Sequence, residues 1–201
     1  MSLYTYFMKI PEHIFFTGVP GSRWSGIAQV IETIPGFNIS DRTPERAYDH
    51  HHYSGHKGAY FGTGMEFEAN LNKGIDYINQ AWTESGGHKL VKSHDWAHFA
   101  RWIKINHPDS WVMLVYRSDL ASYTWWHEAG GFQIKYPCYD WYENSAKMMM
   151  EIQNQNKGIL EYACEVDAKW EYFTPGWVER EFGHTVDIPT VHKDILVTII
   201  K

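Results

Sequence analysis

The stretch that decides the fold runs from Phe15 to Ser25 and reads FFTGVPGSRWS. It begins as a short apolar strand and turns, through Gly18 and Gly21, into what we expect to be a helix. Glycines let the backbone turn tightly, and the first amides of a helix have no intrahelical acceptor. A loop of this kind between a strand and a helix therefore favours an anion, most commonly a phosphate.

The rest of the chain predicts alternating strands and helices. We expect further strands at residues 36–40, 88–94, 111–116, 159–166 and 195–200. We expect helices after the loop and at residues 71–82, 96–103, 119–127, 140–156 and 174–182. Such alternation implies a parallel sheet flanked by helices, and hence an α/β fold.

Length and charge set limits on the class of protein. The 201 residues predict one domain, and a net charge of -6 with a pI near 6.0 argues against nucleic-acid and anionic-membrane partners, because both need a basic face. No stretch approaches the roughly 20 apolar residues of a membrane span, and Lys9, Glu12 and His13 interrupt the apolar start. We expect no signal peptide and a soluble, cytoplasmic protein. Cys138 and Cys164 are too few for a disulfide framework.

Charged side chains come at the ends of three predicted strands. The loop at Gly18 follows the first strand, Lys92 and His94 end a second, and Arg117 ends a third. Ligands of parallel sheets bind at the carboxyl ends of the strands, so these residues predict one shared site. Taken singly, Lys92 is also explained as a solvated strand end, His94 as a buried, hydrogen-bonded histidine, and Arg117 as the ion-pair partner of Asp119.

Three motifs resemble, in their order along the chain, those of the sulfotransferases: residues 17–25, Lys92-Ser93-His94, and Val115-Tyr116-Arg117-Ser118-Asp119. The resemblance covers residues 15–117 well and the remainder loosely. It implies a single sulfotransferase-like domain, 1–201, with a three-layer P-loop NTPase-like fold whose mostly parallel central sheet is flanked by helices. It also implies transfer of a sulfuryl group from 3′-phosphoadenosine 5′-phosphosulfate (PAPS) to a hydroxyl or amine of a small-molecule or carbohydrate acceptor, with no metal.

The resemblance further implies which residues hold the donor. The 5′-phosphosulfate would be wrapped by the loop residues Gly18, Val19, Pro20, Gly21, Ser22, Arg23, Trp24 and Ser25. Arg117 would hold the 3′-phosphate together with Ser122 or Thr124. A guanidinium suits this role because its fork of donors matches the oxygens of a phosphate.

Catalytic roles follow from the same resemblance. His94 would be the general base, since an imidazole accepts a proton near neutral pH. Lys92 would neutralise charge that develops on the transferred group. The basic residue of the family's loop falls at Gly21 in this chain, and Arg23 would reach the phosphosulfate in its place.

Two other functions stay open. A catalytically inactive relative that binds a nucleotide or glycan is prompted by Gly21. A small-molecule kinase that uses Mg-ATP is disfavoured because Trp24-Ser25 replaces the Lys-Ser/Thr pair of such enzymes. The histidines between Asp49 and His56 fit no standard zinc spacing, so we expect no metal there. The 10 Trp, 13 Tyr and 10 Phe favour core packing over stacking on a sugar acceptor.

Overall fold

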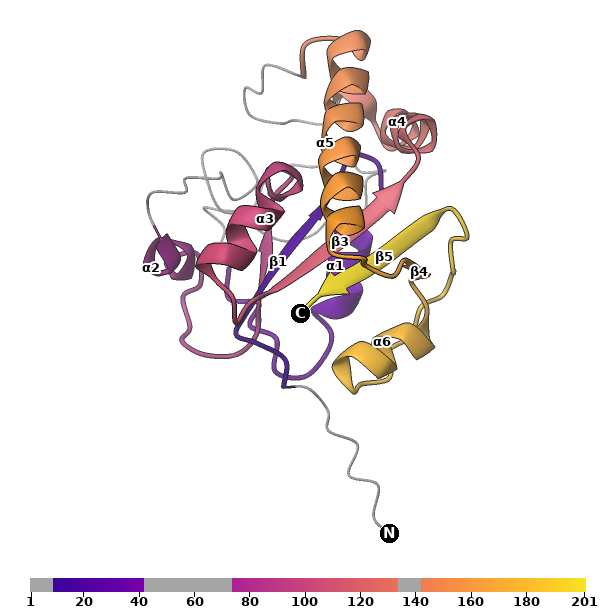
Figure 1. Cartoon of the computed structure of the whole chain (residues 1–201). Helices are drawn as coiled ribbons and strands as arrows, with labels where there is room; N and C mark the ends of the chain where they lie inside the picture. The colour runs from indigo at the N-terminus through magenta and orange to yellow at the C-terminus, as the bar shows by residue number, and fades with distance from the viewer. Residues whose placement is uncertain (1–8, 42–73, 134–141) are drawn as a thin grey trace.

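Five strands form one mixed sheet in the order β2-β1-β3-β5-β4 (Figure 1). The computed structural model of the chain describes residues 9–41, 74–133 and 142–201. The strands are β1 (His13–Gly18), β2 (Lys89–Lys92), β3 (Trp111–Arg117), β4 (Glu171–Tyr172) and β5 (Ile195–Ile200). All of β1 and β2 is buried, as expected for strands that are covered on both faces.

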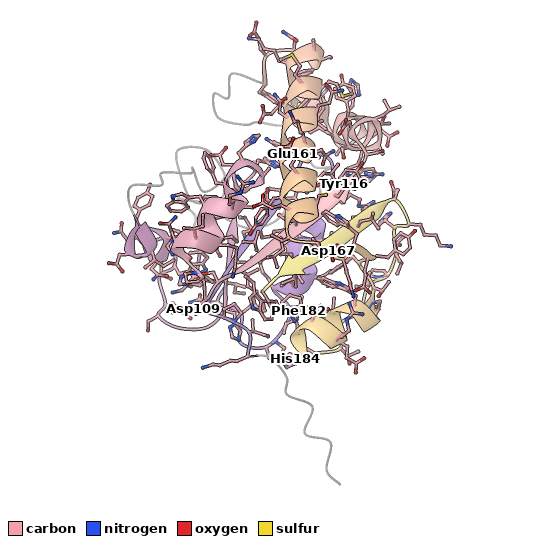
Figure 2. The ribbon with its side chains drawn as sticks, in the orientation of Figure 1. Asp109, Tyr116, Glu161, Asp167, Phe182 and His184 are labelled. Carbon is pink, nitrogen blue, oxygen red and sulfur yellow. The ribbon has the colours of Figure 1, made fainter. Side chains whose placement is uncertain are left out.

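The strand directions define the two ends of the sheet. β1 lies between β2 and β3 and is parallel to both, whereas β5 is antiparallel to β3 and to β4. Four of the five described strands therefore point the same way, and β5 makes the sheet mixed. Figure 2 labels Asp109, just before β3, and Tyr116, near its end, so the carboxyl ends of β1 and β3 lie away from Asp109. The predicted α/β class is confirmed.

Helices cover both faces of the sheet, and Figure 1 shows α3 and α5 in front of it and α1 behind. The α-helices are α1 (Trp24–Ile31), α2 (Gly74–Asn79), α3 (Trp96–Asn106), α4 (Asp119–Glu128), α5 (Ser145–Glu165) and α6 (Pro175–Phe182). A short 3-10 helix, η1 (Gly131–Gln133), follows α4. Within residues 9–41, 74–133 and 142–201, no helix is long and apolar enough to cross a membrane.

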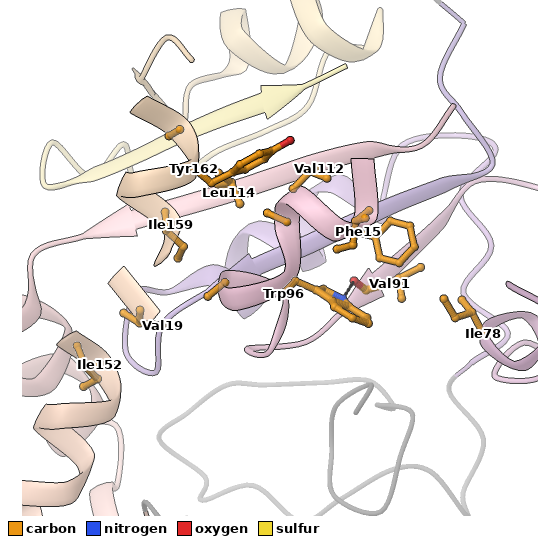
Figure 3. Packing of buried hydrophobic residues seen from close by; sticks show 14 of the residues in the cluster. Phe15, Val19, Ile78, Val91, Trp96, Val112, Leu114, Ile152, Ile159 and Tyr162 are labelled. Atoms are coloured by element: carbon orange, nitrogen blue, oxygen red, sulfur yellow. Dashed lines mark hydrogen bonds between the residues drawn. The ribbon is translucent and has the colours of Figure 1, made fainter. Parts of the chain in front are cut away.

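Two apolar clusters join the helices to the sheet. Alternate residues of a strand point to opposite faces. Phe15 and Leu114 accordingly pack with residues of α3 and α5 (Figure 3), while Phe16 and Met113 pack with residues of α1 and α6. The described part of the chain thus has three layers, with the sheet in the middle.

Two of the expected strands are wrong. Residues 159–165 belong to α5, and Val166 is its C-cap. The buried apolar residues of α5 recur at helical spacing: Met148, Ile152, Ile159, Tyr162 and Ala163. Residues 36–40 form no strand but a single parallel bridge, which joins Phe37 to His88.

Several helix boundaries follow their sequence signals. At α6, the Thr174 side chain accepts a hydrogen bond from the amide of Trp177 at 3.1 Å, and Gly183 ends the helix with φ 72°. This confirms the predicted order of cap, proline and terminal glycine. The helices expected at residues 71–82 and 140–156 correspond to α2 and α5, and residues 71–73 and 140–141 lie outside the described ranges.

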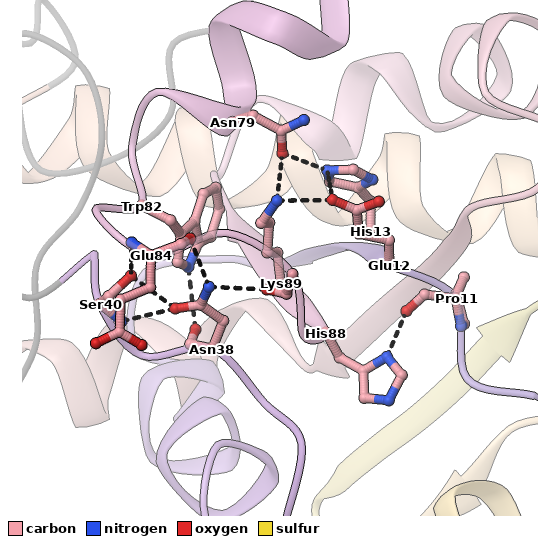
Figure 4. A network of polar contacts seen from close by, with 11 residues as sticks. Pro11, Glu12, His13, Asn38, Ser40, Asn79, Trp82, Glu84, His88 and Lys89 are labelled. Carbon is pink, nitrogen blue, oxygen red and sulfur yellow. Dashed lines mark hydrogen bonds and ion pairs between the residues drawn. The ribbon is translucent and has the colours of Figure 1, made fainter.

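A polar network ties together the amino ends of β1 and β2 (Figure 4). Lys89 Nζ donates to Glu12 Oε1 and to Asn79 Oδ1, both at 2.7 Å. The side-chain amide of Asn38 donates to the carbonyl of Glu84 at 2.9 Å. Because these bonds join segments from before β1, after α1 and around α2, they fasten this end of the sheet.

Candidate functional site

The candidate site lies where the strand order reverses. After β1 the chain crosses to β2 on one side, and after β2 it crosses to β3 on the other side of β1. In open α/β sheets, ligands bind beyond the carboxyl ends of the strands at such a reversal. The loop that follows Gly18 and the side chain of Arg117 both lie at this point.

The loop after β1 is held tightly against α4. Gly21 has φ +77°, and a Cβ at this position would lie 1.9 Å from the carbonyl oxygen of Ser122. The Ser22 amide donates to the carbonyl of Val19 at 3.0 Å, which closes a turn. Arg23 also adopts the left-handed conformation, with φ 64°, and its carbonyl begins α1. Glycine is required at Gly21 both by the backbone conformation and by the space available.

The start of α1 presents backbone donors. The first bonds of the helix are donated by Gly26 and Ile27 to the carbonyl of Arg23, at 3.0 and 3.2 Å. The amides of Trp24 and Ser25 lie at the positive end of the helix dipole, and this end of a helix favours an anion. Ser22 is fully buried, and a Cβ on Gly18 would lie 2.7 Å from its Oγ, so this hydroxyl lies on the inner side of the loop.

Two guanidinium groups flank the loop. Arg23 Cζ lies 4.2 Å from the ring centroid of Trp125, and Arg117 Cζ lies 5.9 Å from the same ring. Arg117 Nη1 donates to the carbonyl of Gly21 at 3.1 Å, while Nε and Nη2 contact Asp194 Oδ2 at 2.7 and 2.6 Å. Trp125 thus stacks on Arg23 and lies at the outer limit of a cation–π contact with Arg117.

The electrostatics of this group favour a negatively charged ligand. Burial, and then the positive charge of Arg117, lower the pKa of Arg23, which nevertheless stays protonated. Burial lowers the pKa of His192 as well, with further lowering by Arg23. Among the described residues, Asp194 is the carboxylate that faces these cations, so two guanidinium charges are set against one negative charge.

A pocket of about 190 Å³ opens beside Arg23. One wall is formed by α1, with the buried Ile27 and the half-buried Val30, and the other is the segment before β5, with Thr190 and His192. Phe173 contributes an aromatic ring to the same pocket. The cavity is mainly apolar with a few polar groups at its edge, which is the usual composition of a small-molecule site.

His94 lies directly beneath the loop. Its Nδ1 is 2.5 Å from the carbonyl of Gly18, and its ring centroid is 4.6 Å from that of Trp24. Because a carbonyl can only accept, Nδ1 carries the proton and Nε2 is the accepting nitrogen of the neutral ring. Burial lowers the pKa of His94 to about 4, against a smaller raising effect of its bond to Gly18. His94 is thus neutral at pH 7 and has the tautomer of a general base.

Lys92 does not accompany His94. Its Nζ lies 2.6 Å from Glu32 Oε1 and 3.5 Å from Asp41 Oδ2, and all three side chains are buried. Glu32 is the C-cap of α1, whereas Trp24, which contacts His94, is its first residue. The eight residues of α1 span roughly 12 Å at about 1.5 Å each. The structure therefore places Lys92 at the opposite end of α1 from the anion donors.

The other predicted donor-binding residues divide into buried residues and residues that a ligand can reach. Val19 and Pro20 are buried, and Val19 belongs to the apolar cluster of α3 and α5. Ser122 is fully buried, and its hydroxyl donates back to the carbonyl of Arg117 at 3.2 Å. Thr124 is exposed on α4. Of the two residues predicted beside Arg117, Ser122 is thus already committed to the backbone, and Thr124 is accessible.

Three residues of the site were missed by sequence reasoning. Trp125 stacks on Arg23, Asp194 binds Arg117, and His192 lines the pocket. Arg117 was expected either to bind a ligand or to pair with Asp119, but Asp119 Oδ1 accepts from Asn156 at 2.6 Å instead. The pairing with Asp194 arises because β5 returns antiparallel to β3, which no local motif indicates.

The histidine-rich segment between Asp49 and His56 lies outside the described residues. Within residues 9–41, 74–133 and 142–201, no group of three or more His, Cys, Asp or Glu side chains could hold a metal ion.

Comparisons of the chain with models of protein families, with curated proteins and with solved structures found no match. The class that the described residues define is an α/β protein with a three-layer arrangement and cationic side chains at the carboxyl ends of β1 and β3.

Proposed function

We propose that the protein is a PAPS-dependent sulfotransferase of P-loop-like fold that transfers a sulfuryl group to a hydroxyl or amine of a small-molecule or carbohydrate acceptor. The observation that carries the proposal is the meeting of Arg23, Arg117 and the first amides of α1 at the carboxyl ends of β1 and β3. Two guanidinium groups against one carboxylate suit a ligand with more than one anionic group.

The arrangement supports a particular placement of the donor. The amides of Trp24 and Ser25, with Arg23, take the 5′-phosphosulfate, because these donors lie at the positive end of α1. Arg117, which already contacts the loop through Gly21, takes the 3′-phosphate. The apolar pocket between α1 and the segment before β5 takes the base, since its walls are mainly aliphatic and aromatic.

His94 takes the proton in the proposed reaction. The acceptor oxygen or nitrogen bonds to sulfur, the bond between sulfur and the phosphate oxygen breaks, and the acceptor proton moves to His94 Nε2. The bond from Nδ1 to the Gly18 carbonyl fixes the ring in the required tautomer. The amides of α1 and Arg23 stabilise the negative charge that the leaving phosphate gains.

Ligand-dependent thermal unfolding tests the donor half of this proposal. A ligand that binds the native state raises its stability, so 3′-phosphoadenosine 5′-phosphate (PAP) will raise the melting temperature more than AMP at the same concentration. Mg-ATP serves as the control for a kinase. If PAP stabilises no better than AMP, a PAPS-dependent function is wrong.

A second candidate is a relative that binds the donor but transfers nothing. It is favoured by two observations: Lys92 is held by Glu32 and Asp41 instead of lying at the loop, and burial places the pKa of His94 at about 4, which makes it a weak base. Mass spectrometry of a broad panel of hydroxyl and amine acceptors, incubated with protein and PAPS, separates the two. Stabilisation by PAP without any sulfated product supports the inactive relative.

A further inference from the structure

The guanidinium of Arg117 forms an ion pair with a carboxylate of the same chain, that of Asp194. Its Nε and Nη2 both contact Asp194 Oδ2, at 2.7 and 2.6 Å, and its Nη1 donates to the carbonyl of Gly21 at 3.1 Å. The side chain of Arg117 is only 12% exposed, whereas that of Asp194 is 49% exposed. The carboxylate therefore covers the solvent side of a cation that is otherwise enclosed.

The backbone keeps Asp194 in this position. The next residue, Ile195, is the partner of Arg117 in the antiparallel pairing of β3 with β5. The carboxylate is thus attached directly beside the paired end of β3 and stays near Arg117 even when its side chain rotates. Partial burial acts to raise the pKa of Asp194, but the hydrogen bond and charge of Arg117 outweigh it and hold that pKa below its ordinary value.

A carboxylate and a phosphate compete for the same donors. Both are anions that only accept hydrogen bonds, and both match the fork of a guanidinium. A phosphate that binds Arg117 must either displace Asp194 or approach it as a like charge, and each costs binding free energy. A free ribose hydroxyl at the same place meets no such penalty, because it can donate to the carboxylate.

We propose that Asp194 is a specificity-determining residue, which weakens the contact of a 3′-phosphate with Arg117 and so reduces, without reversing, the preference of the site for PAP over AMP. The inference rests on the proposed function, because it assigns the 3′ end of the nucleotide to Arg117. Arg23 and the amides of α1 serve the 5′ group. Asp194 contacts Arg117 directly and acts on Arg23 only through space, so it affects the 3′ end of the donor more than the 5′ end.

Calorimetric titration of PAP and of AMP into wild type and Asp194→Asn tests this inference. Asparagine keeps an oxygen that can accept from Arg117 but removes the negative charge. We expect Asp194→Asn to bind PAP about tenfold more tightly, a common magnitude for a like-charge contact, with AMP changed less than about twofold. The gain in PAP affinity shrinks near 1 M salt, where the screening length is about 3 Å.

Asp187→Asn is the matched control. Asp187 lies in the same segment before β5, is exposed, and its removal changes the net charge equally. We expect this variant to bind PAP and AMP as wild type does. Should Asp194→Asn fail to fold, Asp194→Ser makes the same comparison with a smaller side chain.

The outcomes separate this inference from the proposed function. If wild type binds PAP and the Asp194 variant binds it equally or less tightly, Asp194 does not set specificity, and the proposed function stands. A gain that Asp187→Asn shares equally reflects net charge and overturns the inference too. If neither wild type nor the variant binds PAP, both the proposed function and the inference are wrong.

Discussion

At the scale of single residues, Arg23 is a cation of the proposed site whose guanidinium lies beside Trp125 at the start of α1. It stacks on Trp125, and the positive charge of Arg117 acts on it, whereas Asp194 binds Arg117 directly. We expect Arg23→Gln to weaken PAP binding by about tenfold or more, because a partly buried, charge-assisted contact to phosphate is lost. Calorimetry measures the change.

The control for this variant is Arg101→Gln. Arg101 lies on the exposed side of α3 and pairs with Glu165, far in the fold from the loop after β1. Its loss should leave PAP affinity unchanged, because exposed ion pairs contribute little. Equal affinities for wild type and Arg23→Gln would remove Arg23 from the proposed donor site.

His94 separates binding from transfer. We expect His94→Asn to lower the rate of sulfuryl transfer by about 100-fold or more, which is typical for the loss of a general base, and to change PAP affinity less than about threefold. Product formation over the acceptor panel and calorimetry of PAP give the two values. Transfer at the wild-type rate in this variant would assign the proton to another group.

The position of a residue could be predicted where the local chain fixes it, and the roles of these residues stay predictions. Gly21 and Arg23 were found from a local motif, and Arg117 was found because it ends an apolar strand. Lys92 was also found at a strand end, but its partners Glu32 and Asp41 come from the far end of α1 and the segment after it. Partners that the tertiary fold brings together leave no pattern in the local sequence.

At the scale of elements, the turn between β1 and α1 requires glycine at Gly21, whereas α1 itself tolerates a larger residue at Gly26. We expect Gly21→Ala to lower the free energy of unfolding by at least about 2 kcal/mol, because φ is +77° and the added Cβ would lie 1.9 Å from the Ser122 carbonyl. Gly26→Ala, in α1, meets no atom within 4 Å and should be neutral or stabilise by up to about 1 kcal/mol.

Urea denaturation of both variants measures this difference. A Gly21→Ala protein as stable as wild type would show that the loop does not pack against α4 as described. Marked destabilisation by Gly26→Ala would show that the exposed side of α1 is covered.

The elements differ in how well their sequence determines them. β3 was predicted because it is a continuous apolar run of strand length, β1 from the short apolar run before Gly18, and β5 from its β-branched residues. Residues 159–165 form another short apolar run, yet they complete α5, where Ile159 and Ala163 continue the helical spacing of Met148 and Ile152. A short apolar run is ambiguous between strand and helix until the longer period is considered.

At the scale of the whole molecule, buried histidines make stability depend on pH. Burial lowers the pKa of His94 to about 4, so below pH 6.5 the unfolded chain binds a proton that the folded chain does not. The contribution of the neutral His94 imidazole to the free energy of unfolding is complete above pH 6.5. It decreases by about 3 kcal/mol as the pH falls toward 4. His13, His107 and His192, whose pKa values burial also lowers, act in the same direction.

Urea denaturation between pH 7.5 and about pH 4.5 tests this dependence. His98 contributes to the pH dependence of stability in the opposite direction, because its bond to Glu151 raises its pKa. Since His94→Asn lacks the buried imidazole, we expect the unfolding free energy of wild type to fall on acidification more steeply than that of the variant. Parallel curves for the two proteins would show that His94 is protonated as readily in the folded as in the unfolded chain.

The carboxyl ends of β1 and β3 form the proposed anion site for a nucleotide, and a crystal structure of the protein with PAP tests this most directly. We predict the 5′-phosphate at the amides of Trp24 and Ser25 within reach of Arg23, and the 3′-phosphate beside Arg117. Phosphates bound away from these residues, or crystals without PAP at concentrations that saturate binding in solution, would contradict the account.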